Sequence, residues 1–470
     1  MKPRIQHFQL LEKLALRSCY PQTSRYIHTT VTKQASVAAA PATAVPYSPS
    51  PTSKQPALSV LPTSTVLRTL LVTSISSSPI LLSACISVLT RLLNSRSLLT
   101  DVDKNPMIRW LLKHTFYAQF CAGESRAEVQ RTMKALKDVG YRGIILEYAL
   151  EVLKSEGGNV EKDIETWRQG MIETVQMTAE GDFVGLKWSG LGSAALDLLQ
   201  HNQPPSPSMD KAIREVCDLA SSKGVKLLPA AEETRTNTGI DQWSLNLQKQ
   251  YNNTPGKVVL YNTYQCYLKA TPATLARHLA AARRDGFTLG IKLVRGAYLA
   301  AEPEHLTLAT KEETDSAYDS IAESLMKRQY GSVLAPLQGF GSEAFPAIDV
   351  VLACHNAVSV RKAQALRSEQ SARGEPKVPL VYAQLQGMAD EVSCELVQAG
   401  KAQLDADSEK LDIDVPEVYK CATWGTTGQC LNYLLRRAAE NKDAAGRTKE
   451  SRRAMAGELW RRIRAVAGLA

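Results

Sequence analysis

The chain has 470 residues, of which 44% are hydrophobic and 22% charged, with 27 Gly and 22 Pro. This composition supplies a large buried core and excludes a fibrous or wholly disordered protein. Nine Cys without a C-x-x-C pair argue against a disulfide scaffold or a zinc ribbon and favour a reducing compartment. The net charge of +9 comes from the first 100 residues, which hold ten Lys or Arg and one acid. The rest of the chain is balanced, so no nucleic-acid partner is expected.

Residues 1–34 form a basic leader that is rich in Ser, Thr, Ala and Arg and nearly free of acidic residues. Within it, residues 6–17 place leucines around Lys13 and Arg17, and residues 24–29 resemble a matrix-protease cleavage site. This pattern predicts a disordered mitochondrial transit peptide, with a basic tail of no targeting role as the alternative. Residues 35–64 lack periodicity and are predicted to be a low-complexity linker.

Residues 65–137 are predicted to form an N-terminal helical segment. The apolar stretch at 66–93 is interrupted by three serines and Pro79, so its unbroken part covers only residues 79–90. That part is shorter than the about 20 residues that a bilayer span needs. We therefore expect two short helices that pack on the body and contact a membrane face, with true insertion as the alternative.

Between residues 138 and 445, short apolar runs typical of buried strands alternate with segments of helical periodicity. The eight runs lie at residues 143–147, 183–187, 225–229, 258–261, 289–294, 348–354, 378–384 and 418–422. Helices are predicted at residues 160–178, 209–223, 239–251, 272–285, 311–330, 356–369, 388–399 and 428–442. Parallel strands need a crossover helix each time, so the pattern predicts an α/β fold, a (βα)8 TIM-type barrel. A doubly wound sheet is the alternative, and residues 446–470 are expected to form a C-terminal helix or tail.

Polar side chains end nearly every predicted strand. They are Glu147, Lys187, Glu232 with Glu233, Asn262, Arg295, His355 with Asn356, Gln384 and Thr423. Apolar strands do not need polar ends to fold, and the chemistry of such barrels gathers at the carboxyl ends of the strands. The sequence therefore predicts a polar site at this face, although any one of these residues could be a satisfied loop residue.

Two further segments carry chemistry. The adjacent pair Arg436 and Arg437 lies on a predicted helix, with Glu440 placed to orient either one. Together with Lys187 they would make a cationic spot suited to a carboxylate, whereas a solvated helix face is the usual fate of such a pair. In residues 290–298, Lys292 interrupts an apolar run and Tyr298 follows a glycine turn, as a flat ligand would require.

Other catalytic chemistries lack support in the sequence. His355 has no histidine or carboxylate partner at metal-ligand spacing, so no metal site is predicted. A G-x-S-x-G elbow for a nucleophilic serine is also missing. Hydrolysis by a nucleophile or by zinc is therefore not expected.

The segments Ile-Lys-Leu-Val-Arg-Gly-Ala-Tyr (291–298) and Tyr-Leu-Leu-Arg-Arg-Ala-Ala-Glu-Asn (433–441) closely resemble signatures of the proline dehydrogenase family. Four more blocks, at residues 185–188, 260–265, 353–356 and 383–388, look like the family's blocks in the family's order. The resemblance covers residues 138–442, and residues 420–425 look most like fungal mitochondrial members.

The resemblance implies an FAD enzyme on a distorted (βα)8 barrel. Such an enzyme oxidises L-proline to Δ1-pyrroline-5-carboxylate and passes electrons to ubiquinone. Its expected place is the mitochondrion, as a peripheral protein on the matrix side of the inner membrane. The candidate residues suit this reaction, because removing a hydride from a carbon next to an amine needs orientation and electrostatic support rather than a strong acid.

The resemblance also assigns roles to residues. Lys187, Arg436 and Arg437 are expected to hold the substrate carboxylate, with Leu293, Tyr298 and Leu385 over the ring and Glu147 in a gate with Arg436. Lys292 is expected near the reactive nitrogen of the flavin. Other residues fall at flavin-contact positions, namely Val294, Arg295, Gly296, Asn262, Thr314, His355, Asn356, Gln384 and Glu440.

Two positions depart from the family pattern. Many members carry an Asp at the end of the third strand and a Tyr at the end of the eighth, where this chain has Ala230 and Cys421. This leaves open a degenerate paralogue that binds or regulates without turnover. A Schiff-base lyase that uses Lys187 or Lys292 is a third possibility. The sequence does not separate proline from hydroxyproline as the substrate.

Overall fold

The computed structural model describes residues 56–95, 97, 100–149, 159–338, 345–406, 414–440 and 445–468. The predicted transit peptide and most of the predicted linker lie outside these residues. The packed body begins earlier than the expected boundary at residue 65, because Leu58 and Leu61 are buried with the outer core of the barrel.

The N-terminal part is helical and consists of η2 (Ala57–Val60), α2 (Thr63–Ser76), α3 (Pro79–Asn94), α4 (Pro106–Leu112), the π-helical turn η3 (Lys113–Tyr117) and α5 (Ala118–Phe120). The predicted break between two short helices is confirmed. Ser78 caps α3 by accepting a hydrogen bond from the Leu81 amide, and Pro79 occupies the first turn, where its missing N–H costs nothing.

Among the described helices, none alone has the length and apolar character that a bilayer crossing needs. The pair α2 and α3 meets that test only when taken together, and a bend of 99° separates the two helices.

A parallel sheet forms the barrel, which confirms the predicted fold. Its strands are β2 (Gly143–Tyr148), β3 (Phe183–Leu186), β4 (Lys226–Pro229), β5 (Asn262–Gln265), β6 (Leu289–Val294), β7 (Ile348–Ala353), β8 (Leu380–Leu385) and β9 (Glu417–Trp424). The order around the sheet is β4-β3-β2-β9-β8-β7-β6-β5, and the short β1 (Cys121–Gly123) adds to β9. Strands β4 and β5 meet through a single described bridge, Leu227 to Leu260. The barrel is thus nearly closed, which excludes the doubly wound alternative.

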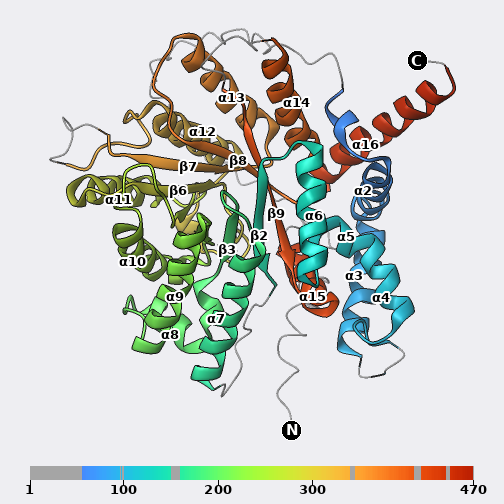
Figure 1. Cartoon of the computed structure of the whole chain (residues 1–470), viewed down its shortest axis with the longest axis horizontal. Coiled ribbons are helices and arrows are strands. Elements are labelled where there is room, and N and C mark those ends of the chain that lie inside the picture. The colour runs from blue at the N-terminus through green and yellow to red at the C-terminus, as the bar shows by residue number, and fades with distance from the viewer. Residues whose placement is uncertain are drawn as a thin grey trace, which may run out of the picture. The chain divides into compact units, whose positions relative to one another are not determined.

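Helices alternate with these strands, as predicted. They are α6 (Arg126–Val139), α7 (Val160–Met177), α8 (Ser193–Gln200), α9 (Pro207–Lys223), α10 (Thr234–Tyr251), α11 (Thr271–Asp285), α12 (Lys311–Lys327), α13 (Ala357–Ala372), α14 (Asp390–Ala406) and α15 (Thr427–Glu440). Short 3-10 turns lie at η4 (Trp188–Leu191) and η5 (Glu304–Leu306), and α16 (Ala445–Val466) ends the described chain. Figure 1 shows α16 beside α2, on the side of the barrel where α2–α5 gather.

The fourth predicted strand, at residues 258–261, is wrong. Regular pairing begins only at Asn262, after the apolar run has ended. Within the run, the Asn252 side chain accepts hydrogen bonds from the amides of Val259 (2.9 Å) and Leu260 (3.1 Å) and donates to the Leu260 carbonyl (2.7 Å). A side chain therefore satisfies buried backbone groups that a neighbouring strand would otherwise satisfy.

Successive side chains of the strands serve two separate cores. One set fills the barrel interior and includes Ile145, Phe183, Val351, Ala383 and Cys421. The alternate residues, such as Ile291 and Leu352, pack against the surrounding helices. Because the side-chain period of a strand is two, this division tells which polar residues face the interior.

Candidate active site

Several of the predicted site residues share the inward face of the barrel at its carboxyl end. Glu147 follows the interior residue Ile145 by two positions, and Leu385 follows Ala383 in the same way. Lys187 continues β3 in extended conformation, and Lys292 lies between two residues that face the helices. We refer to the carboxyl end of the barrel interior as the mouth.

Charged groups converge on Cys421 inside the barrel. Burial raises the pKa of its thiol well above the usual range, the nearby Glu147 carboxylate raises this pKa further, and the ammonium group of Lys292 opposes the shift. Cys421 is therefore a neutral thiol with an anion and a cation for neighbours. The three residues come from β2, β6 and β9, so the barrel brings distant parts of the chain together.

Helix α15 reaches both sides of the mouth. The Tyr433 hydroxyl donates to Glu147 Oε2 at 3.3 Å, at the end of β2. Arg437 donates to the Tyr298 hydroxyl at 3.5 Å, in the segment after β6. The Arg437 guanidinium also lies 5.6 Å from the ring centroids of both Tyr298 and Tyr433, within the range of cation–π contacts. These contacts bring one arginine of the predicted pair to the mouth.

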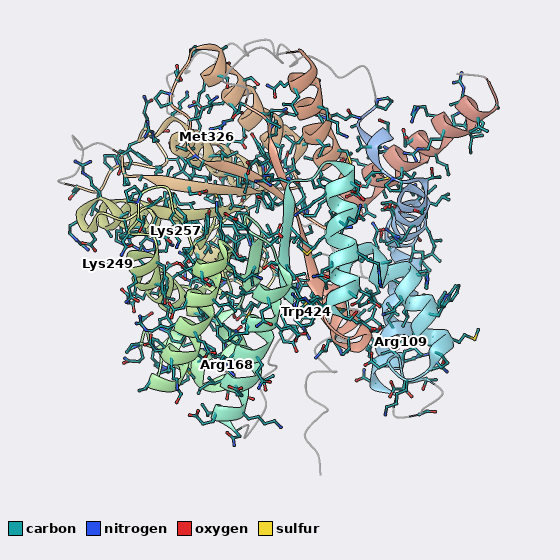
Figure 2. The ribbon with its side chains drawn as sticks, viewed as in Figure 1. Arg109, Arg168, Lys249, Lys257, Met326 and Trp424 are labelled. Atoms are coloured by element: carbon teal, nitrogen blue, oxygen red, sulfur yellow. The ribbon has the colours of Figure 1, made fainter. Side chains whose placement is uncertain are left out.

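The N-terminal segment anchors the start of α15. Glu124 accepts from the Thr427 amide at 2.7 Å, and Asp103 accepts from the Gly428 amide at 2.9 Å. Burial favours the neutral form of Glu124, but hydrogen bonds from Arg109, Lys113 and Thr427 outweigh it and lower its pKa to about 2. A carboxylate thus caps the positive end of the helix dipole. Figure 2 shows Arg109 on α4 and Trp424 at the end of β9.

The turn after β6 requires its glycine. Gly296 has φ +138°, and a Cβ there would lie 1.4 Å from the ring of Tyr267. The turn also contacts Gln265, whose side-chain oxygen accepts from the Ala297 amide at 3.4 Å. Gln265 ends β5 on the inward face, and the analysis of the sequence missed it. The alternation of side chains could have found it, because Tyr264 packs toward the helices and its neighbour Gln265 therefore faces the interior.

The structure separates three predicted residues from the mouth. Leu293 is fully buried in the outer core, on the side of β6 that faces the helices. Asn262 begins β5 rather than ending a strand, and its amide donates to Asp241 of α10 at 2.7 Å. The Gln384 amide donates to the Cys354 carbonyl at 3.2 Å, and its oxygen accepts from the Ser393 hydroxyl of α14 at 3.1 Å. All three side chains face the helical layer, because neighbouring positions on a strand face opposite ways.

A second group of predicted residues forms a network outside β6. Arg295 pairs with Asp315 of α12, donates to Ser359 of α13 at 2.6 Å and lies 5.0 Å from the ring of Tyr318. Asn356 caps α13 by accepting from the Val358 amide at 2.9 Å. The Thr314 hydroxyl bonds the Thr310 carbonyl in the first turn of α12. The contacts of Arg295 and Asn356 join strand ends to helix starts, whereas the Thr314 bond lies within the start of α12.

The remaining predicted residues lie around the same end of the barrel. His355 follows β7, and its Nε2 accepts from the Leu385 amide at 3.0 Å. Val294 ends β6 on the inward face that Lys292 shares, and Arg436 is half-buried on α15. Glu440 is the last residue of α15, and its side chain lies outside the described part. Ala230 follows β4, where its amide bonds the Leu186 carbonyl at 2.7 Å.

The mouth combines two inward lysines, one inward carboxylate and an arginine that lies near the rings of two tyrosines. Such a set can bind a small anion and stabilise negative charge on a flat group. Among the described residues, no group of His, Cys, Asp or Glu could hold a metal ion.

The chain is similar to proteins of one family. A model of the proline dehydrogenase family matches residues 129–450. The hydroxyproline dehydrogenase of Bos taurus is 28% identical over 404 residues, which cover 75% of this chain and 82% of the relative. The probable mitochondrial proline dehydrogenase of Schizosaccharomyces pombe is 27% identical over 418 residues, with coverage of 76% and 81%.

Solved structures show the same fold. Proline utilization A from Bdellovibrio bacteriovorus superposes with a TM-score of 0.57 at 17% sequence identity, over 78% of this chain and 38% of that protein. A variant of proline utilization A from Bradyrhizobium japonicum gives a TM-score of 0.52 at 14% identity, over 84% and 42%. The chain therefore spans about two fifths of the length of these proteins.

Proposed function

The chain belongs to the proline dehydrogenase family and is an oxidoreductase that acts on a CH–NH group; from this premise, we propose that it oxidises L-proline to Δ1-pyrroline-5-carboxylate with FAD as cofactor. The observation that carries this proposal is that two cations lie at the same mouth. Lys292 faces the barrel interior, and Arg437 of α15 reaches Tyr298 after the same strand. One cation suits a flat cofactor that gains negative charge on reduction, and the other suits a small carboxylate.

Substrate binding is assigned to the cations of the mouth. Arg436 and Arg437 of α15 and Lys187, directly after β3, hold the carboxylate, because two guanidinium groups offer parallel donors that remain charged. Tyr298 and Leu385 contact the ring. The predicted contact from Leu293 is dropped, since its side chain is fully buried on the side of β6 that faces the helices. A gate between Glu147 and Arg436 stays a prediction.

The residues at the mouth fit FAD by their chemistry. Lys292 is a cation inside the barrel, and Gln265 and the Gly296 turn offer hydrogen-bonding groups close by. Val294 and His355 complete the inward rim. When bound, FAD would be the acceptor of the hydride and its two electrons. Gly296 keeps the turn tight against Tyr267, so the backbone can approach a planar ring.

The chain's own part in the reaction is orientation and electrostatics. Hydride leaves the ring carbon bonded to the amine nitrogen, that nitrogen gives up a proton, and a C=N bond forms. Fixing the carboxylate under α15 aligns that carbon, and Lys292 stabilises the negative charge that the cofactor gains. No residue of the mouth is required as a strong acid.

The electron acceptor and the location are further parts of the proposal. Relatives named mitochondrial and the basic leader at residues 1–34 support a mitochondrial protein. Exposed apolar side chains on α3 and α4 support peripheral contact with the inner membrane, on the matrix side, where ubiquinone would accept the electrons. The most exposed are Ile80 (81%), Met107 (80%) and Trp110 (61%).

The central test measures flavin reduction by substrate. The purified chain is expected to carry a yellow flavin band that L-proline bleaches, and trans-4-hydroxyproline in a parallel sample tells the two substrates apart. A folded protein that cannot be reconstituted with FAD would overturn the proposal. Bleaching by proline would also speak against the degenerate paralogue and the Schiff-base lyase, neither of which has gained a supporting observation.

A second test addresses the carboxylate. Arg437→Lys is expected to weaken binding of the proline analogue tetrahydrofuroic acid by about tenfold or more, because one ammonium group cannot replace two parallel donors. Flavin retention should change little. The matched control is Arg283→Lys, which makes the same exchange on the exposed face of α11. Equal losses of analogue and flavin would contradict the assigned role.

A further inference from the structure

The position of α15 leaves the outer face of β9 to other elements. In a regular (βα)8 barrel each strand is followed by a helix that packs beside it. Here α15 contacts the mouth at Glu147 and Tyr298 instead. The outward Lys420 of β9 contacts Asp390 and Ser393 of α14, and β1 pairs with the end of β9. Residues of α2, α5 and α6, from the N-terminal segment, lie around the same strand.

These elements border a cavity of about 420 Å³ that opens to solvent. The volume falls in the range of about 300–1,000 Å³ that is usual for small-molecule sites. Most of its wall is apolar and includes Leu61, Ala118, Ala122, Leu136 and Val139. The cavity lies on the opposite face of β9 from Cys421, because Lys420 lines it and Cys421 faces the barrel interior. It is therefore distinct from the mouth.

One part of the cavity wall is polar and buried. Lys420, which is 1% exposed, donates to Asp390 and Ser393 at 2.8 Å each, so its charge is matched within the protein. Arg68 of α2 donates through Nε to Gln119 at 3.2 Å. Burial lowers the pKa of Arg68, and Asp390 opposes this shift. The side-chain oxygen of Gln386 is buried and has no hydrogen-bond partner among the described residues.

The charges of the wall are unequal. Four cations line the cavity, against the two carboxylates of Glu128 and Asp390; the cations are Arg68, Lys113, Arg131 and Lys420. Lys113 is engaged by Glu124 (2.6 Å) and Glu128 (2.8 Å), as Lys420 is by Asp390. The positive excess therefore rests on Arg68 and Arg131. Arg131 is exposed at the cavity edge, whereas Arg68 is half-buried.

We propose that this cavity binds an amphiphile with a single carboxylate head and an unbranched hydrocarbon chain, as in a medium-chain fatty acid. The head contacts Arg68 and the amide of Gln386, and the chain lies along the apolar wall. Rotation of the Gln386 amide about its last bond presents its NH2 group to the carboxylate. A carboxylate head offsets part of the positive excess of the wall, which a neutral head would leave unmatched.

The test measures binding to the full chain by titration calorimetry, and so it does not depend on turnover. Three probes separate the contributions: decanoate has both head and chain, decanol lacks the charge, and butyrate lacks most of the chain. One decanoate per chain is expected, with decanol at least tenfold weaker and butyrate not detected. Failure of decanoate to bind, or equal affinity for decanol, would overturn the proposal whatever the activity of the enzyme.

Two variants locate the site. Arg68→Gln is expected to weaken decanoate binding about tenfold or more, whereas Arg91→Gln, the same exchange on the exposed face of α3, should leave it unchanged. Ala118→Trp fills the cavity and should abolish binding of both decanoate and decanol. If the tryptophan variant does not fold, the two arginine variants decide the question. Equal affinity of Arg68→Gln and the unaltered chain would contradict the assignment.

Discussion

The two faces of the barrel strands use charge in different ways. On the inward face at the mouth, Glu147 and Lys292 come from strands on different sides of the barrel, and both act on the thiol of Cys421. On the outward face, Lys420 and Asp390 form a close pair at 2.8 Å, with Ser393 completing the contacts. A charge on the outward face is matched by the helix that packs on it. At the mouth, charges gather where a ligand would bind.

This difference teaches that a polar residue near a strand end does not by itself mark a site. The face on which the residue lies decides what it contacts. Arg295 and Lys292 belong to the same motif, yet Arg295 pairs with Asp315 of a helix and Lys292 lies inside the barrel. The comparison therefore predicts that outward substitutions change stability and inward ones change catalysis.

The largest effect is expected from Lys420→Met. Removing this cation leaves Asp390 buried without its partner, which costs about 3–5 kcal/mol in comparable pairs. Urea unfolding should show the loss of free energy, while any folded protein keeps its kcat/KM for proline. The double variant Lys420→Met/Asp390→Leu should recover much of the stability, because no uncompensated charge remains. A folded single variant of full stability but low activity would break the comparison.

A pH effect of similar size is expected from His278 on α11. Its ring nitrogen bonds the Tyr264 hydroxyl at 2.8 Å, and burial, helped by the charge of Arg277, lowers its pKa to about 4. An unfolded chain binds the proton near pH 6.5. The histidine's contribution to stability is therefore complete above that pH and is lost as the pH falls toward 4.

The measurement compares the free energy of unfolding with that of His278→Gln, in which glutamine can still accept from Tyr264. The free energy of unfolding of the unaltered protein, minus that of the variant, should fall by about 3 kcal/mol between pH 7 and pH 4. Asp241, whose pKa burial raises to about 6, is present in both proteins and cancels. A difference that does not vary with pH would contradict a neutral buried ring.

Lys292→Met tests the inward face. Loss of the cation beside the proposed flavin should lower kcat/KM by about a hundredfold, or about 2.7 kcal/mol. The midpoint of thermal unfolding should stay nearly constant, because Lys292 is not part of a helix-facing ion pair. Lys292→Arg is the matched control and should retain much of the activity. If Lys292→Met leaves turnover unchanged and lowers stability, this residue behaves like the outward-facing ones and the comparison fails.

The smallest effect distinguishes two leucines. Leu293→Val removes one methylene group from the outer core and should cost about 1 kcal/mol of stability with no change in the KM for proline. Leu385→Val, at a position that is 38% exposed, should raise the KM with little change in stability. The reverse pattern would show that Leu293, and not Leu385, contacts the substrate.

Much of the fold could be predicted from the sequence, because alternating apolar runs and helical segments report the barrel directly. Seven of the eight runs overlap strands of the structure, from residues 143–147 to 418–422. The exception, at residues 258–261, is apolar and buried like a strand. Part of its backbone bonds Leu227 at the single bridge. The rest is satisfied by Asn252, a side-chain interaction that no local pattern of hydrophobicity reveals.

The site was harder to predict, because a motif tells which residues are near a strand end but not which face they occupy. The alternation of side chains separates Lys292 from Leu293, but applying it requires the true start of each strand. The misplaced fourth strand explains why Asn262 was chosen and Gln265 was missed. The path of α15 across the mouth depends on tertiary contacts such as those of Glu124 and Asp103.

The single bridge between Leu227 and Leu260 makes the barrel wall tolerant of new chain ends. Near this seam the chain passes through an exposed turn, where Gly256 has φ +77° and open space around it. At the other end of the described chain, Arg462 of α16 donates to the Leu61 carbonyl at 2.8 Å, just before α2, so α2 and α16 are neighbours. A circular permutant opened at Gly256 and joined from α16 to α2 would keep every regular strand ladder intact.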